Sequence, residues 1–137
     1  MRVICPHCIQ INNIPKKASY NKANCGKCKK SLLDYSPLEL TDENFDKVID
    51  NTDIPVIINI WAPWATHTGR HHFIETATKY PLKALFTYVN TDKSKQTTER
   101  LGICCVPSLR IFKDSIEVHR EDDGRFPLIA LVEKFIS

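Results

Sequence analysis

The most informative stretch of this 137-residue chain is Val56-Ile57-Ile58-Asn59-Ile60-Trp61-Ala62-Pro63-Trp64. Its first six residues form a nearly unbroken β-branched run, which is typical of a strand that is buried on both faces of a sheet. A helical pattern follows and ends before Pro81, because the residue before a proline disfavours helical backbone angles. The stretch therefore predicts a strand, a loop and a helix at the centre of an α/β domain.

The residues on either side alternate between strand and helix patterns. Further strands are expected at 38–40, 85–89, 108–113 and 116–119, the last two as a hairpin around Asp114-Ser115. Further helices are expected from Thr41 as the N-cap, over 94–101 with Gly102 after it, and over 126–136. The expected inward-facing side chains are Phe45, Val48 and Ile49 in the first helix, Phe73, Ile74, Ala77 and Tyr80 in the second, and Leu128, Leu131, Val132 and Phe135 in the last. The order βαβαβαββα predicts a mixed central sheet flanked by helices.

Charge and cysteine content both change near residues 34–37. Residues 1–33 hold seven basic and no acidic side chains, whereas the remaining residues hold twelve basic and sixteen acidic ones. Four of the six cysteines also lie before residue 30. These changes divide the chain into a small N-terminal module, residues 1–35, and a larger domain, residues 36–137.

The composition excludes several classes of protein. Hydrophobic residues make up 42% and charged residues 26% of the chain, which is typical of a folded domain and not of a disordered one. No apolar run approaches the roughly 18 residues that a membrane span needs. The first residues lack the apolar segment of a signal peptide, so we expect a cytoplasmic protein that does not associate with membranes.

The N-terminal module carries two C-x2-C pairs, Cys5-Pro6-His7-Cys8 and Cys25-Gly26-Lys27-Cys28, with sixteen residues between them. This spacing is typical of a zinc ribbon, in which four thiolates hold one Zn²⁺ in a closed, structural site. We expect Gly26 to supply a positive φ in the second turn and His7 to be an exposed loop residue. Two disulfides, or four unoccupied thiols, are the alternatives, and a reducing cytosol disfavours the disulfides. The module offers only Tyr20 for base stacking, so its positive charge is a weak indication of nucleic-acid binding.

These motifs together resemble the thioredoxin family. Trp61-Ala62-Pro63-Trp64 after a buried strand is similar to one family motif, and Gly102-Ile103-x-x-Val106-Pro107-Ser108 before another strand is similar to a second. With the cysteine pairs in front, the whole chain resembles the zinc-ribbon thioredoxins of the bacterial thioredoxin-2 type. The resemblance implies a thioredoxin fold, a cis Pro107, and a groove for protein or peptide segments. The residues that the resemblance implies for this groove are Trp61, Trp64, Val106, Pro107 and Gly124.

The residues that should carry the family's chemistry are different here. The family has Cys-Gly-Pro-Cys directly after Trp64, whereas this chain reads Ala65-Thr66-His67-Thr68. Disulfide reduction needs a low-pKa thiolate at the start of the helix and a second thiol that resolves the mixed disulfide, and Ala65 and Thr68 supply neither. The family's buried Asp is replaced by Asn59, and a Lys near that Asp looks to be replaced by Tyr88. The sequence therefore predicts a redox-degenerate thioredoxin that binds protein segments without disulfide exchange.

Two sets of residues leave other functions open. Cys104 and Cys105 lie just before Pro107 and would allow a thiol–disulfide oxidoreductase that works through one of these thiols. His67 and His71 are four residues apart on the expected helix and, with Cys105, would form a metal- or redox-responsive binding site. The partner and the oligomeric state do not follow from the sequence.

Overall fold

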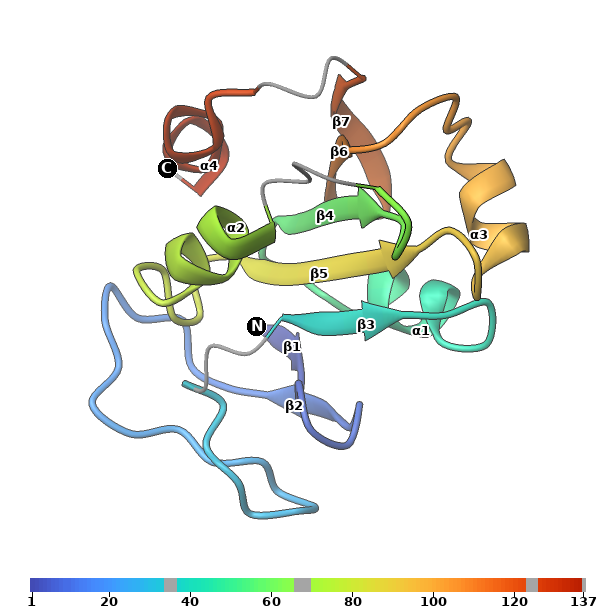
Figure 1. Ribbon diagram of the computed structural model, residues 1–137. Helices are drawn as coiled ribbons and strands as arrows, with labels where there is room; N and C mark the ends of the chain where they lie inside the picture. Colours follow the sequence, from blue (N-terminus) through green and yellow to red (C-terminus); the bar gives the residue numbers. More distant parts are fainter. Residues whose placement is uncertain (34–36, 66–69, 123–125, 137) are drawn as a thin grey trace.

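The strand expected at the centre of the fold, β4 (Val56–Trp61), is the middle strand of a five-stranded sheet in the computed structural model (Figure 1). The structure is described for residues 1–33, 37–65, 70–122 and 126–136. The sheet has the order β3-β5-β4-β6-β7, and its other strands are β3 (Leu38–Leu40), β5 (Leu85–Asn90), β6 (Ser108–Lys113) and β7 (Ile116–Glu121). The first three strands run parallel, and β6 and β7 are each antiparallel to their neighbours. The mixed sheet is the one that the sequence predicts.

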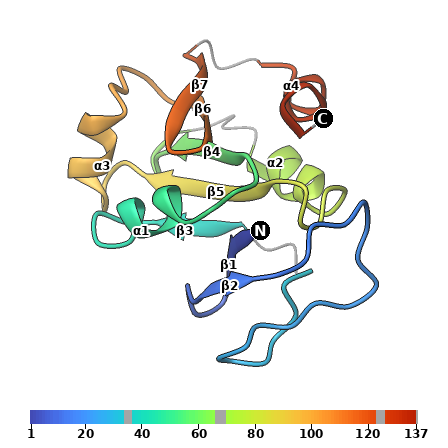
Figure 2. The same ribbon diagram turned by 180° about the vertical axis from the view of Figure 1, so that it is seen from behind.

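Helices cover both faces of this sheet. The helices α1 (Phe45–Asp50) and α3 (Lys95–Arg100) lie over one face, and α2 (Arg70–Ala77) and α4 (Leu128–Ile136) lie over the other (Figures 1 and 2). Successive side chains of β4 point to opposite faces, so Ile58 and Ile60 enter one core while Ile57 enters the second. The double burial explains the unbroken apolar run of this strand.

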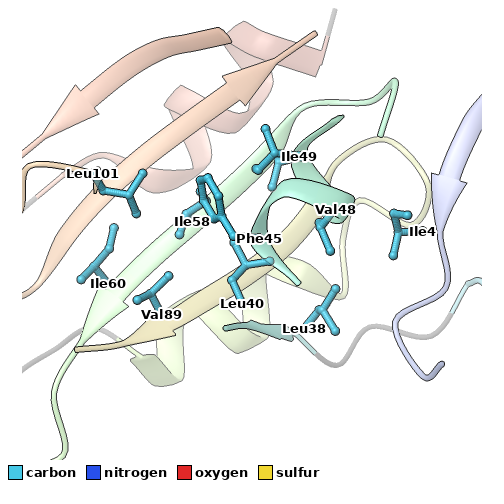
Figure 3. Packing of buried hydrophobic residues seen from close by; sticks show 11 residues of the cluster. Ile4, Leu38, Leu40, Phe45, Val48, Ile49, Ile58, Ile60, Val89 and Leu101 are labelled. Carbon is cyan, nitrogen blue, oxygen red and sulfur yellow. The ribbon is translucent and has the colours of Figure 1, made fainter. Parts of the chain in front are cut away.

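The first core gathers side chains from β3, β4, β5 and α1 (Figure 3). Phe45 of α1 points at the sheet beside Ile58, and Leu101 closes the far side of the cluster (Figure 3). Ile4 from the N-terminal module belongs to the same cluster. The core therefore includes a residue that precedes the sheet by more than thirty positions.

The N-terminal module packs against the larger domain. Its strands β1 (Arg2–Ile4) and β2 (Ile11–Asn13) form an antiparallel hairpin. The Arg2 guanidinium lies 3.0 Å from a carboxylate oxygen of Asp53, and the backbone N–H of Arg2 donates to the same carboxylate at 2.6 Å. A third apolar cluster spans the contact, and its members include Val3, Leu32, Ile54 and the partly buried Leu82 and Leu85. The module is thus attached to the larger domain by apolar packing as well as by the covalent connection of the polypeptide.

Three local expectations are wrong in detail. The regular helix begins at Phe45, after a turn at residues 42–44. Thr41 caps this turn as expected, because its Oγ1 accepts from the N–H of Asn44 at 3.2 Å and its N–H donates to Asn44 Oδ1 at 2.8 Å. Ile74 is 39% exposed, and Thr76 is buried in its place, since α4 covers only one side of the short α2. The hairpin strand β7 extends to Glu121 instead of ending at residue 119.

Several turn predictions are confirmed. Gly102 follows α3 with a φ of +65°, and Asp114 and Ser115 of the hairpin have φ values of +53° and +67°. Among the described residues, no helix combines the length and the apolar character that crossing a membrane requires.

Candidate functional site

The four cysteines of the N-terminal module are brought together by two equivalent turns. In the first turn, the N–H of Cys5 donates to the Gln10 carbonyl at 3.0 Å, and the N–H of Ile9 donates to the Cys5 carbonyl at 2.9 Å. The second turn repeats this pattern with Cys25, Lys29 and Lys30. The expected positive φ at Gly26 is wrong. The left-handed positions are Ile9 and Lys29, directly after each cysteine pair, with φ of 63° and 68°.

The sulfur atoms have the spacing of a four-thiolate metal site. Cys5 Sγ lies 3.7 Å from Cys28 Sγ, Cys8 Sγ lies 3.6 Å from Cys25 Sγ, and all four lie within 4.8 Å of one another. A tetrahedral Zn²⁺ with bonds of about 2.3 Å separates its sulfurs by about 3.8 Å, so the arrangement fits zinc. Among the described residues, no other group of three or more Cys, His, Asp or Glu side chains is close enough to hold an ion. His7 is exposed and lies outside this group, as expected.

The pKa values of Cys5 and Cys25 are shifted in opposite directions. Burial raises the pKa of Cys25, but N–H groups from Cys28, Asn12 and Lys27 outweigh it and lower that pKa to about 5. Burial also raises the pKa of Cys5, to about 12, so a metal that binds there must displace a proton. Asn12 is a supporting residue that the sequence did not reveal. Its amide donates to Cys25 Sγ at 3.5 Å and accepts from the N–H of Gly26 at 2.9 Å.

A second candidate site lies where β4 ends and β6 begins. The register pairs Ile60 with Ser108, which places Val106 and Pro107 beside the segment that follows β4. The Val106–Pro107 peptide bond is cis, Val106 is half-buried and Pro107 is buried. Trp64 is 71% exposed, and its indole N–H donates to Asp92 Oδ1 at 3.3 Å. This end of the sheet therefore carries one large exposed aromatic ring, which contacts Asp92 after β5, and the proline loop that leads into β6.

Part of the expected groove lies outside the described residues. This holds for Thr66, His67 and Thr68 of the altered motif, and for Gly124. Ala65 is described: it is half-buried, and its N–H donates to the Ala62 carbonyl at 3.1 Å. Trp61 is half-buried, and Arg70 at the start of α2 stacks on it with 4.1 Å between the guanidinium carbon and the ring centre.

The two adjacent cysteines lie on the loop before Pro107. Both thiols are exposed and reduced, and their sulfurs are 3.4 Å apart. Cys105 Sγ also donates to the Asp122 carbonyl at 3.1 Å, which ties the loop to the end of β7. The hydrogen bond with Cys104, together with some burial, raises the pKa of Cys105. A raised pKa keeps this thiol protonated and less nucleophilic at neutral pH.

Buried Arg110 contacts both the start of this loop and Asp122, the residue to which Cys105 donates. It lies on β6 with no exposed area, and its guanidinium is 2.8 Å from Asp122 Oδ1 and 3.4 Å from Glu117 Oε1. It also donates to the carbonyls of Leu101 and Gly102, directly before the cysteines. This burial could not be predicted from the sequence, because an arginine in a strand pattern is ordinarily an exposed residue.

Asn59 lies at the floor of a cavity on the α2 face of the sheet. It is 1% exposed, and neither its amide nitrogen nor its carbonyl oxygen has a hydrogen-bond partner among the described residues. The cavity has a volume of about 120 Å³ and is lined by Pro37, Asn59, Arg70, Phe73, Ile74 and Tyr88. Tyr88 is the direct neighbour of Asn59 in the sheet, and burial followed by the negative charge of Glu39 raises its pKa.

The histidines are not brought together with Cys105 in the described part of the chain. His71 is exposed and pairs through Nε2 with Glu75 at 2.9 Å. Its expected partner His67 lies outside the described residues.

Comparisons with known proteins agree with this architecture. The family model described as "Thioredoxin" matches residues 36–134. Thioredoxin C-3 of Corynebacterium nephridii is 30% identical over 122 residues, covering 88% of this chain and 83% of that protein. This coverage exceeds what residues 36–137 supply, so the match extends into the N-terminal module. Thioredoxin 1 of Nostoc sp. is 33% identical over 85 residues, covering 58% of this chain and 77% of that protein.

Solved structures show the same fold at low sequence identity. The long form of thioredoxin f from spinach chloroplast superposes with a TM-score of 0.70 at 18% identity, covering 77% of this chain and 90% of that one. The thioredoxin of Malassezia sympodialis has a TM-score of 0.65 at 21% identity, covering 76% and 94%. The fold, the matched residues and the relative that spans most of the chain lead to one conclusion: the protein belongs to the thioredoxin family.

Proposed function

We propose that this protein binds extended protein segments beside the Val106–Pro107 loop and does not exchange disulfides. The observation that carries the proposal is Ala65, which stands where the family reaction needs its attacking thiolate. Thr68 stands where the resolving thiol would be, so neither half of the reaction has its group. Asn59, in place of a buried carboxylate, agrees with this, because a charged group would be costly there without a chemical task.

The binding surface would use what remains at this end of the sheet. Trp64 offers a large exposed ring, and the loop before β6 offers backbone groups that an extended segment can pair with. An exposed aromatic ring is the kind of residue that supplies much of the energy in a small interface. The partner is therefore expected to be a protein or peptide in extended conformation.

The proposal is tested by measuring binding and reduction separately. Calorimetry with alkylated insulin B chain, an extended peptide without free thiols, should detect weak binding that Trp64→Ala or Pro107→Ala lowers by about tenfold. Ile116→Ala is the matched control. Ile116 is also a large exposed apolar residue, at 65%, but it lies at the start of β7, at the end of β6 that is far from Pro107. Insulin reduction with a thioredoxin reductase should stay at the background rate. Reduction at the rate of an ordinary thioredoxin would overturn the proposal.

The names of the relatives favour a second candidate, a thiol–disulfide oxidoreductase. In this chain such an activity would have to use Cys104 or Cys105. The raised pKa of Cys105 speaks against it, and no C-x-x-C partner is present to release a mixed disulfide. Activity that disappears in Cys105→Ser but survives in Cys104→Ser would establish this candidate. A metal- or redox-responsive site of His67, His71 and Cys105 stays a prediction, as does the cytoplasmic location.

We also propose that Cys5, Cys8, Cys25 and Cys28 hold one structural Zn²⁺ and that residues 1–35 form a zinc ribbon. The spacing of the sulfurs supports this, and the closed set of four thiolates leaves no position for a reacting water. The ion would therefore stabilise the module and take no part in a reaction.

A further inference from the structure

We propose that the cavity beside Asn59 binds a small carboxylate ligand. This proposal does not rest on peptide binding at the Pro107 loop. Its starting point is the side-chain amide of Asn59, which lines the cavity, is 1% exposed and has no hydrogen-bond partner among the described residues. The indole N–H of Trp61, two positions further along β4 on the same face of the sheet, also has no partner there, although Trp61 does not line the cavity. Buried polar groups of this kind normally have a hydrogen-bond partner, and a bound ligand would supply one.

The charge around the cavity favours an anion. Arg70 lines the cavity, and its guanidinium is held over the rings of Trp61 and Tyr88 at 4.1 and 5.2 Å. Arg70 forms no ion pair with any described acidic residue, and the described residues that line the cavity include no acidic one. An arginine fork and an amide N–H are together well suited to the two oxygens of a carboxylate.

One nearby charge opposes anion binding. Glu39 on β3 is paired with Tyr88 in the sheet, and its negative charge contributes to the raised pKa of Tyr88. It does not line the cavity, but its field reaches the same tyrosine. Removal of this charge should therefore strengthen the binding of an anion and weaken the binding of a cation.

The size and the remaining lining restrict the ligand. A volume of about 120 Å³ is more than one water molecule needs and leaves room for only a few heavy atoms. Pro37, Phe73 and Ile74 provide the apolar part of the lining. A short-chain carboxylate such as acetate matches both parts, because its oxygens would meet Arg70 and Asn59 while its methyl group meets the apolar part.

The test is an NMR titration of the full, metal-loaded chain with sodium acetate, against sodium chloride at the same ionic strength. The side-chain amide of Asn59 reports directly from the cavity, and the indole N–H of Trp61 reports through Arg70, which stacks on its ring. Acetate should shift both signals saturably, with a Kd in the millimolar range that is usual for so small a ligand. Arg70→Met should weaken binding by at least about tenfold, since a hydrogen bond to a charged group is lost. Glu39→Gln should tighten it.

Arg100→Met is the matched control. Arg100 also stacks on an aromatic ring, with 4.8 Å to the centre of Phe45, but it lies on the opposite face of the sheet and away from the cavity. This variant should leave the acetate affinity unchanged. The proposal is wrong if acetate gives no saturable shift, if chloride gives the same shift, or if Arg70→Met and Arg100→Met behave alike. A crystal structure in acetate that contains only water in the cavity would overturn it as well.

Discussion

At the scale of single residues, Asn59 is a polar side chain that the core buries without a hydrogen-bond partner among the described residues. A polar side chain buried without a partner costs stability, yet an ionised carboxylate in the same position would cost more. We predict that Asn59→Asp has a raised carboxyl pKa, because burial disfavours the charged form. In acid below about pH 4, where an unfolded Asp is also protonated, the variant should be nearly as stable as the parent. Its stability should then fall as the pH rises through the unfolded pKa towards neutrality, since the unfolded state loses its proton first.

Urea unfolding at pH 4 and at pH 7 measures this difference. Asn59→Leu is the control for the altered core, because it changes packing without adding a titrating group. A variant Asn59→Asp whose stability relative to the parent is the same at both pH values would mean that solvent reaches position 59.

Arg110 provides the second prediction at this scale. It is wholly buried and lies against two partly exposed carboxylates and the carbonyls of Leu101 and Gly102. Arg110→Met would remove the ion-pair partner of Asp122 and the donor to the Gly102 carbonyl. We expect a loss of about 1–3 kcal/mol in the free energy of unfolding. Arg120 is the natural comparison, because it lies opposite Arg110 in the sheet and also pairs with Glu117, but its side chain is 49% exposed. Arg120→Met should cost less than about 1 kcal/mol in the same urea experiment. Equal losses would show that the burial of Arg110 is not what matters.

At the scale of elements, the N-terminal module and the sheet are coupled by packing. Val3, Leu32 and Ile54 share a cluster, and Ile4 lies in the first core of the larger domain. Because of these contacts, we expect the unfolding of the module to affect the larger domain. We predict one Zn²⁺ per chain, and we predict that a chelator lowers the thermal midpoint of the larger domain by several degrees as well as unfolding the module.

Both tryptophans, Trp61 and Trp64, lie in the larger domain, so their fluorescence reports its unfolding separately from the metal count. Cys25→Ser should lose the metal and lower the midpoint, whereas Cys105→Ser should do neither. If the thermal midpoint measured by tryptophan fluorescence is unchanged after complete metal removal, the packing between the two parts adds nothing to the stability of the larger domain.

The elements also show what the sequence could and could not reveal. The buried run of β4, the positive φ of Gly102 and the hairpin at Asp114-Ser115 follow from local chemistry and are confirmed. The inward position predicted for Ile74 is wrong, because a periodic pattern shows which side of a helix is apolar but not how much of that side a neighbouring element covers. The docking of Ile4 and the burial of Arg110 depend on partners far along the chain, and no local pattern contains them. In the second site, Ala65 could be read directly, whereas the cavity beside Asn59 needed the packed structure.

At the scale of the whole molecule, the chain has the thioredoxin fold, and our proposal is that it lacks only the reacting groups of the family. The helices, the sheet order and the proline loop are in place, so on this proposal disulfide exchange should appear when those groups are supplied. We predict that Cys-Gly-Pro-Cys at residues 65–68 gives measurable insulin reduction, and that adding Asn59→Asp increases the rate. Initial rates with a thioredoxin reductase measure both steps. If the four-residue replacement folds, as judged by circular dichroism, and still has no activity, the surrounding site differs more than its residues suggest.

The position of Ile4 in the core of the sheet has a consequence for the order of events during synthesis. The ribosome releases the four cysteines long before β4 and β5, whose side chains belong to the same apolar cluster as Ile4. A nascent chain can therefore load its metal before it has a sheet, and it must keep Val3, Ile4 and Leu32 exposed until Leu85 emerges. Early metal loading would hold these three apolar side chains in one small folded unit, and so shorten the period in which they could engage another growing chain.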